Sequence, residues 1–187
     1  MTVQYAIVVF PAFDSPEPIE AVRRAFDPHA ALLPAHITLV FPFPASADAA
    51  ALRTHLDATL SGVSSFDVTL AAPSVEHDAY LFLRVDAGRQ RLIALHDALY
   101  TGPLALHLSS THTYEPHVTV GHLASRDAIP EALLTARKDI PAGSCAHVSG
   151  VSLFRLEEGA GHVEFTLPLV PGDDSRSIAM RSAPNER

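Results

Sequence analysis

"PAHITLVF" at residues 34–41 and "EPHVTVGH" at residues 115–122 each place a histidine two residues before a threonine, with an apolar residue after each of them. Alternate residues of a β-strand point to the same face. In a strand, His36 and Thr38 therefore share one face, while the apolar residues anchor the opposite face in a core. His117 and Thr119 repeat this arrangement. The pattern predicts two strands that each present one imidazole and one hydroxyl group together.

The segments that follow the two motifs repeat the same order of predicted elements. Each motif is followed by one helical pattern and two strand patterns, which lie at 45–62, 65–75 and 79–86 and then at 125–139, 147–159 and 161–170. The last two strands are expected to form a hairpin. Further patterns predict a strand at 4–10 and helices at 14–27 and 88–102.

This repeated order predicts an α+β fold with two lobes and an approximate internal two-fold relation. We expect one bilobal domain over residues 1–170, with an antiparallel sheet and helices in each lobe. The two His-Thr pairs then face each other across a cleft between the lobes. Residues 171–187 are polar and lack periodicity, which predicts a disordered tail.

The composition limits the class of protein and its partners. The chain has 187 residues, is 48% hydrophobic and carries a net charge of −8, which is typical of a globular protein that does not bind long nucleic acid. Cys145 is the single cysteine, which excludes an internal disulfide and a C-x-x-C metal or redox motif. The N-terminal stretch lacks the basic segment of a signal peptide, and no apolar run is long enough to cross a membrane. We expect a cytoplasmic monomer that does not bind membranes.

Two opposed imidazoles suit a reaction that needs a base on one side and an acid on the other. The pKa of an unperturbed histidine is near 6.5, so one ring can be neutral while the other is protonated. In-line attack on a phosphodiester requires this arrangement, and Thr38 and Thr119 are placed to bind the phosphoryl oxygens. The scheme assigns catalysis to these threonines with His36 and His117, and it needs no metal and no cofactor.

The two motifs resemble the paired His-x-Thr motifs of the 2H phosphoesterase superfamily, the 2′-5′ RNA ligase-like and cyclic-phosphodiesterase family. The resemblance covers residues 1–170 in the order of motifs and elements. It implies a two-lobed α+β fold, catalytic His36 and His117, and phosphate binding by Thr38 and Thr119. It also implies a small nucleotide or an RNA end as the substrate, with a 2′,3′-cyclic or 2′-5′ phosphodiester linkage and no metal.

Three further residues are candidates for substrate binding. Phe41 matches an aromatic position that often follows the first motif in this family. Tyr114 precedes the second motif by three residues, and its position suits either stacking on a base or plain packing. His122 stands where many members carry arginine, so the second motif lacks a permanent cation and its bidentate fork. This departure from the family pattern and the acidic net charge favour hydrolysis of small substrates over ligation of RNA ends, although they leave the direction of the reaction open.

Three other interpretations of the motif stay open. The histidines could be ordinary strand residues, or the protein could bind nucleotides or phosphate without catalysis. The 11 histidines also invite a metal site. His112, His117 and His122 are five residues apart, and an odd spacing in an extended strand alternates faces, so we do not expect them to converge.

Overall fold

After each motif strand the chain continues with a helix and then with strands, as the sequence predicts. The computed structural model describes residues 3–45, 48–77, 79–109, 113–157 and 160–172. Its elements are β1 (Gln4–Val9), β2 (Ala12–Phe13), α1 (Pro16–Phe26), β3 (Ile37–Pro44), α2 (Ala49–Leu60), β4 (Phe66–Leu70), β5 (Ser74–Glu76), β6 (Tyr80–Arg84), α3 (Arg89–Leu99), the 3-10 helix η1 (Gly102–His107), β7 (His117–His122), the 3-10 helix η2 (Arg126–Ala128), α4 (Ile129–Asp139), β8 (Ser144–Val148), β9 (Gly150–Glu157) and β10 (Ala160–Pro168).

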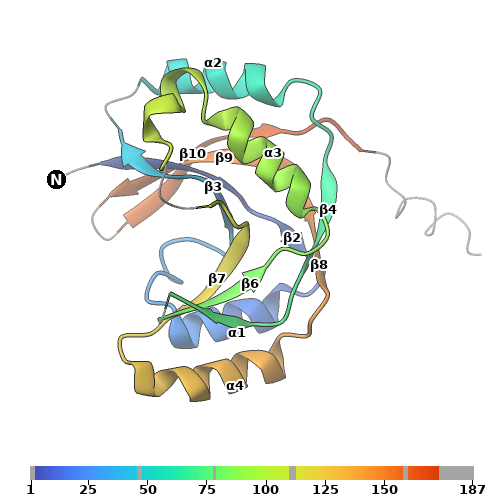
Figure 1. The fold of residues 1–187 in the computed structure, drawn as a ribbon. Coiled ribbons are helices and arrows are strands. Elements are labelled where there is room, and N and C mark those ends of the chain that lie inside the picture. The colour runs from blue at the N-terminus through green and yellow to red at the C-terminus, as the bar shows by residue number, and fades with distance from the viewer. Residues whose placement is uncertain (1–2, 46–47, 78, 110–112, 158–159, 173–187) are drawn as a thin grey trace, which may run out of the picture.

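Two antiparallel sheets carry the repeated motif at their edges. The strands of one sheet lie in the order β10-β9-β1-β3, and those of the other lie in the order β5-β6-β7. The motif strands β3 and β7 are therefore edge strands, and they lie next to each other where the two lobes meet (Figure 1). The predicted α+β fold with two lobes is confirmed.

Each motif strand is covered by the α-helix that precedes the other motif strand in the chain. Helix α1 packs against β7, and helix α3 packs against β3. In Figure 1, α2 and α3 lie at one end of the molecule, and α1 and α4 lie at the other. Among the described residues no helix is long and apolar enough to cross a membrane. The leucines that give α2 and α3 their apolar faces are buried: Leu52, Leu56, Leu60, Leu92, Leu95 and Leu99.

The prediction of one strand over residues 65–75 is wrong. β4 ends at Leu70, and β5 begins at Ser74 in a different sheet. Pro73 lies between them and has no N–H group with which to continue a strand ladder. The chain therefore leaves the sheet β2-β8-β4 at this point and enters the sheet of the second motif.

The predicted strand over residues 147–159 is also divided between two sheets. β8 ends at Val148 and β9 begins at Gly150, although β9 and β10 do form the predicted hairpin ladder. A Cβ atom at Gly150 would lie 3.0 Å from Cγ2 of Thr166 and 3.1 Å from the carbonyl oxygen of Leu167. Glycine therefore permits the close approach of β10 at the point where the chain changes sheets.

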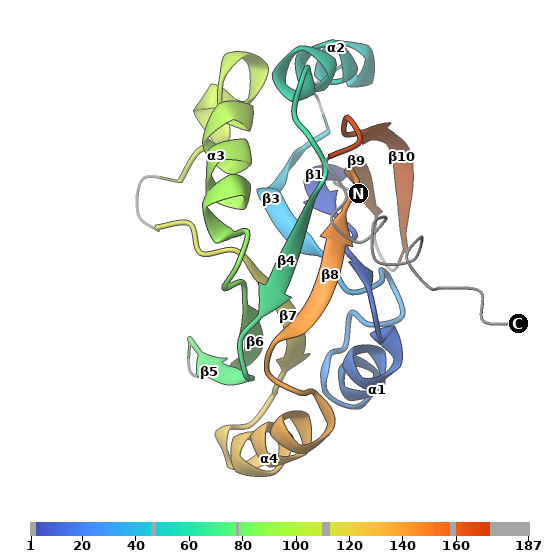
Figure 2. The same cartoon turned by 90° about the vertical axis from the view of Figure 1, so that its right-hand side faces the viewer.

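The strands β4 and β8 join the two halves of the molecule. They pair antiparallel, with Val68 opposite Ala146, and they run side by side in Figure 2. Each comes directly after the helix that follows a motif strand. The equivalent elements of the two halves therefore meet at the centre, as an approximate two-fold relation requires.

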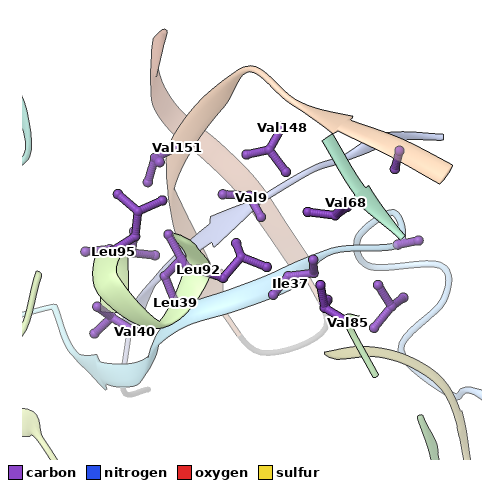
Figure 3. Packing of buried hydrophobic residues seen from close by; sticks show 14 of the residues in the cluster. Val9, Ile37, Leu39, Val40, Val68, Val85, Leu92, Leu95, Val148 and Val151 are labelled. Carbon is purple, nitrogen blue, oxygen red and sulfur yellow. The ribbon is translucent and has the colours of Figure 1, made fainter. Parts of the chain in front are cut away.

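Buried apolar side chains form one main cluster that extends from the four-stranded sheet into both three-stranded sheets. Figure 3 shows part of it, where Leu92 and Leu95 of α3 lie against Leu39 and Val40 of β3. A second, smaller cluster lies on the opposite face of the four-stranded sheet and contains Ala6, Val8 and Phe154. Both faces of this sheet are therefore apolar.

The predicted C-terminal tail is described only at its beginning. The backbone N–H of Gly172 donates a hydrogen bond to Oγ of Ser65 at 2.9 Å, which holds this residue on the body of the protein. The remaining residues, 173–187, lie outside the described residues, and their disorder stays a prediction.

Candidate active site

The two motif strands turn their polar residues toward one cleft. On β3, Ile37 and Leu39 are fully buried in the core, while Thr38 between them is half-buried. On β7, Val118 and Val120 are buried in the same way on either side of the half-buried Thr119. The alternation that the sequence predicts is therefore present in both strands.

Two adjoining cavities meet at the threonines. Thr38 and Thr119 line both a smaller cavity of about 280 Å³ and a larger cavity of about 770 Å³. His36 lines the smaller cavity, and His117 lines the larger one. A group held between the two hydroxyls therefore has one histidine on each side.

Each of these histidines is anchored by its own chain. Nδ1 of His36 lies 2.9 Å from the carbonyl oxygen of Pro34, and Nδ1 of His117 lies 2.6 Å from the carbonyl oxygen of Glu115. A carbonyl oxygen only accepts hydrogen bonds, so Nδ1 carries the proton in both rings. In the neutral ring Nε2 is then the basic nitrogen that is available to a substrate.

Burial lowers the pKa of both histidines. Removal from water is the largest effect on His36 and on His117, and it outweighs the backbone hydrogen bond that raises each pKa. The charge of either ring also disfavours a charge on its partner, since His117 lowers the pKa of His36. Both rings are therefore neutral at neutral pH until a negatively charged group enters between them.

The ring of Phe82 fixes the orientation of His117. Their centroids are 3.7 Å apart, and the planes differ by 16°. His36 has a looser aromatic neighbour, Phe10, with a centroid separation of 6.3 Å and a tilt of 58°. His117 is therefore the more tightly packed ring of the two.

The loop before His36 is held by a buried arginine of α1. Arg23 is 1% exposed, and its Nη1 donates to the carbonyl oxygen of Leu33 at 3.0 Å and to Glu20 at 3.1 Å. The other carboxylate oxygen of Glu20 accepts the backbone N–H of Ala35 at 2.7 Å. This network fixes the chain immediately before the first histidine.

Tyr114, a predicted substrate-binding residue, lines the larger cavity and also contacts β3. Its hydroxyl donates to the carbonyl oxygen of Thr38 at 2.8 Å, and burial raises its pKa. Its ring stacks on His96, with centroids 3.8 Å apart and planes within 2°. Nδ1 of His96 in turn donates to the carbonyl oxygen of Leu39 at 2.8 Å. At the edge of β3, backbone carbonyl groups therefore accept hydrogen bonds from side chains and not from a further strand.

Phe41, the second aromatic candidate, lies at the same edge. Its backbone N–H donates to the hydroxyl of Tyr100 at 3.1 Å. Its ring lines the larger cavity and is 46% exposed. A side chain of this size is exposed enough to contact a ligand in the cavity.

A β-bulge brings His122 into the cleft, contrary to the expectation from its spacing. Between Thr119 and Gly121 strand β7 advances by two residues while its partner β6 advances by one. The additional residue reverses the alternation of faces. His122 therefore lines the smaller cavity beside Thr119, on the same side of the strand as His117, whereas His112 lies outside the described residues.

His122 is part of a row of stacked rings in the smaller cavity. Its ring lies on that of Tyr80, with centroids 4.2 Å apart and planes within 5°. The ring of His29 lies 6.5 Å from that of His122, with planes 16° apart. The structure thus brings all seven predicted site residues to the walls of the two cavities: His36, Thr38, Phe41, Tyr114, His117, Thr119 and His122.

Strand β6 contributes residues to the cleft that the motifs do not predict. Tyr80, Phe82 and Arg84 all line the larger cavity, while Leu81 and Leu83 between them are buried. The alternation in "AYLFLRVD" places Tyr80, Phe82 and Arg84 on one face of the strand, and the pairing of β6 with β7 turns that face toward the cleft. His29 and His77, which the sequence does not single out, also line the cavities. In the described part of the chain no group of His, Cys, Asp or Glu side chains is arranged to hold a metal ion.

Comparison with known families identifies one match that spans most of the chain. A family model described as the 2′-5′ RNA ligase superfamily matches residues 10–160. These residues include both motif strands and the helices that cover them.

Two bacterial proteins that carry the name "putative phosphoesterase" are similar in sequence. The protein from Bacillus licheniformis is 26% identical over 137 residues, which cover 72% of this chain and 79% of that protein. The protein from Geobacillus thermodenitrificans is 29% identical over 121 residues, which cover 63% of this chain and 68% of that protein.

The fold is similar to a solved structure of Escherichia coli LigT complexed with 3′-AMP. The TM-score is 0.58, and the match covers 90% of this chain and 99% of that chain at 17% sequence identity. At this level of identity the likeness shows a shared fold.

Proposed function

The chain belongs to the 2′-5′ RNA ligase superfamily, and from this membership we propose that it is a phosphoesterase that cleaves 2′,3′-cyclic phosphate or 2′-5′ phosphodiester linkages. The names of its bacterial relatives support phosphoesterase activity. The observation that carries the proposal is the position of Thr38 and Thr119, which line both cavities between two anchored histidines.

In the proposed reaction one histidine acts as a base and the other acts as an acid. Nε2 of the neutral ring takes a proton from water as the water oxygen bonds to phosphorus. Nε2 of the protonated ring gives its proton to the 2′ or 3′ oxygen as the bond from that oxygen to phosphorus breaks. The product of a cyclic substrate is a nucleoside phosphate monoester, and the two histidines have exchanged protonation states.

The threonine hydroxyls are proposed to donate hydrogen bonds to the non-bridging phosphoryl oxygens. These oxygens carry the charge of an in-line transition state, so donors fixed in place favour it. The negative charge of the phosphate also raises the pKa of a neighbouring histidine. Substrate binding then supplies the protonated acid that the empty cleft lacks.

We propose a small nucleotide or the end of an RNA as the substrate, bound by a monomer in the cytoplasm. The net charge of −8 disfavours a long polyanion, because binding along nucleic acid depends on clustered cations. The complex of LigT with 3′-AMP supports a ligand of mononucleotide size. The single cysteine fits a reducing compartment.

The test is hydrolysis of nucleoside 2′,3′-cyclic phosphates and 2′-5′ dinucleotides in the presence of EDTA. The parent protein is compared with His36→Ala, His117→Ala and, as a matched control, His162→Ala, whose ring lies on β10 and lines neither cavity. We expect turnover that each cleft substitution reduces by about 10²-fold or more and that the control leaves unchanged.

Other results would support a different function. Binding of phosphate compounds without turnover of any of these substrates would indicate a noncatalytic nucleotide- or phosphate-binding protein. Activity that EDTA abolishes would indicate a metal-dependent reaction. Equal losses in all three histidine variants would contradict a specific role for the two motif histidines.

A further inference from the structure

Arg84 lies directly beside one of the proposed catalytic histidines. It is the last residue of β6, and the antiparallel register with β7 places it opposite His117. Residues opposite each other in such a pair have Cβ atoms about 5 Å apart. Arg84 lines the larger cavity together with His117, Thr38 and Thr119. Its side chain is therefore within reach of the place where the proposed reaction occurs.

Arg84 is also the single lysine or arginine among the described residues that line either cavity. The remaining walls consist mainly of aromatic rings, histidines and apolar side chains. A guanidinium group keeps its charge at every physiological pH and binds phosphate through two parallel N–H bonds. His36 and His117 are neutral before a ligand binds, because burial lowers the pKa of both rings. The permanent positive charge on the cleft wall thus comes from Arg84.

The guanidinium is held by a carboxylate that a ligand can replace. Nε and Nη2 of Arg84 donate to Glu76 at 3.0 and 2.7 Å, and Oγ of Ser74 donates to the same carboxylate at 2.9 Å. The Arg84 side chain is 51% exposed. The Glu76 side chain is only 18% exposed, so the guanidinium is the accessible partner of the pair. A phosphoryl group can replace its two N–H bonds to Glu76 with two parallel bonds of its own.

We propose that Arg84 binds the phosphate of the substrate by exchanging its ion pair with Glu76 for the phosphoryl oxygens. This inference rests on the proposed function, because a phosphoester is the ligand that brings such an anion between Thr38 and Thr119. Glu76 then holds the guanidinium in place while the cleft is empty and competes with the phosphate for it.

The test is binding of inorganic phosphate, measured by titration calorimetry, since it needs no turnover. We expect Arg84→Gln to weaken binding by about 10-fold or more, and Arg84→Lys to weaken it less because the charge remains. Glu76→Gln removes the competing carboxylate, so binding should become about 3-fold tighter or more. Arg53→Gln is the control, because Arg53 forms an exposed ion pair with Asp57 on α2 and lines neither cavity.

The opposite signs of the two effects separate phosphate binding from a structural role. If the ion pair only supports the fold, Glu76→Gln and Arg84→Gln weaken phosphate binding to the same extent, and the proposal is wrong. Unchanged binding in Arg84→Gln overturns it as well. If the parent hydrolyses cyclic phosphates but Arg84→Gln binds phosphate as tightly as the parent, this proposal is wrong and the proposed function stands. Loss of binding in Arg84→Gln without turnover in the parent would refute the function alone.

Discussion

His36 and His117 are held by the same contact in the two halves of the molecule. Nδ1 of each ring donates to the carbonyl oxygen two residues earlier, at 2.9 Å in His36 and at 2.6 Å in His117. The repeat is therefore preserved in the hydrogen bonds of the side chains as well as in the order of the elements. Both rings share one tautomer and one buried setting, and this has a measurable consequence for stability.

The free energy of unfolding should fall as the pH is lowered from about 7 to about 5. Burial holds the folded-state pKa of His36 and His117 below the unfolded value of about 6.5, so the unfolded chain binds more protons in this window. Protonation then favours unfolding, and the stability present above the unfolded pKa is lost as the pH drops through the folded one. Urea unfolding at a series of pH values measures this slope.

The double variant His36→Gln/His117→Gln should show a shallower slope over the same pH range, because neither glutamine titrates. His162→Gln serves as the control, since this ring lies outside both cavities. A double variant whose pH dependence equals that of the parent would show that other groups dominate acid destabilisation.

Thr38→Val and Thr119→Val should each reduce kcat/KM on a cyclic phosphate by about 10²-fold. Valine has a similar shape but lacks the hydroxyl that we propose donates to the phosphoryl oxygens, and loss of one such donor has an effect of this size. Thr38→Ser and Thr119→Ser retain the hydroxyl and should keep most of the activity. Serine variants that are as slow as the valine variants would assign the threonines to packing.

The motif residues could be predicted from sequence because alternation in a strand is a local property. His36 and Thr38 need only an extended backbone and buried neighbours to share a face, and "HITL" supplies both. The repeated order of helices and strands then indicates two lobes, since elements of this length leave few other arrangements. His36, Thr38, His117 and Thr119 meet at the cavity walls for these reasons.

The position of His122 could not be predicted in the same way. Its face depends on one additional residue in β7, and this bulge is defined only against the partner strand β6. A Cβ atom at Gly121 would lie 3.2 Å from Cβ of Phe26, so the bulge also depends on packing against α1. Contacts between segments this far apart in the chain leave no periodic signal in either segment. The breaks at Pro73 and Gly150 likewise depend on which sheet each strand joins, and the strand pattern in the sequence does not show this.

Tyr114→Phe should lower kcat more than it raises KM. The substitution removes the hydrogen bond to the carbonyl oxygen of Thr38 but keeps the ring that stacks on His96. The carbonyl then lacks a partner at the edge of β3, which costs about 1–3 kcal/mol, and the Thr38 hydroxyl is held less firmly. Steady-state kinetics on a cyclic phosphate and urea unfolding measure the two effects.

Tyr100→Phe provides the matched control for this variant. Tyr100 also binds the edge of β3, but its hydroxyl accepts the backbone N–H of Phe41, which lies beyond the motif. We expect a similar loss of stability and a much smaller loss of kcat. Equal losses of kcat in the two variants would show that the edge of β3 acts as one unit, without a specific role for Tyr114.

Arg23→Gln should destabilise the protein by about 3–5 kcal/mol, although Arg23 touches neither cavity. The substitution leaves the carboxylates of Glu20 and Asp27 without their cation, and an unpaired buried charge has a cost of this size. Arg24→Gln is the control, because Arg24 is the adjacent residue but its ion pair with Glu17 is exposed. The free energy of unfolding of Arg24→Gln should stay within about 0.5 kcal/mol of that of the parent. Urea unfolding that shows equal effects of the two substitutions would mean that the buried network does not hold the chain before the first histidine.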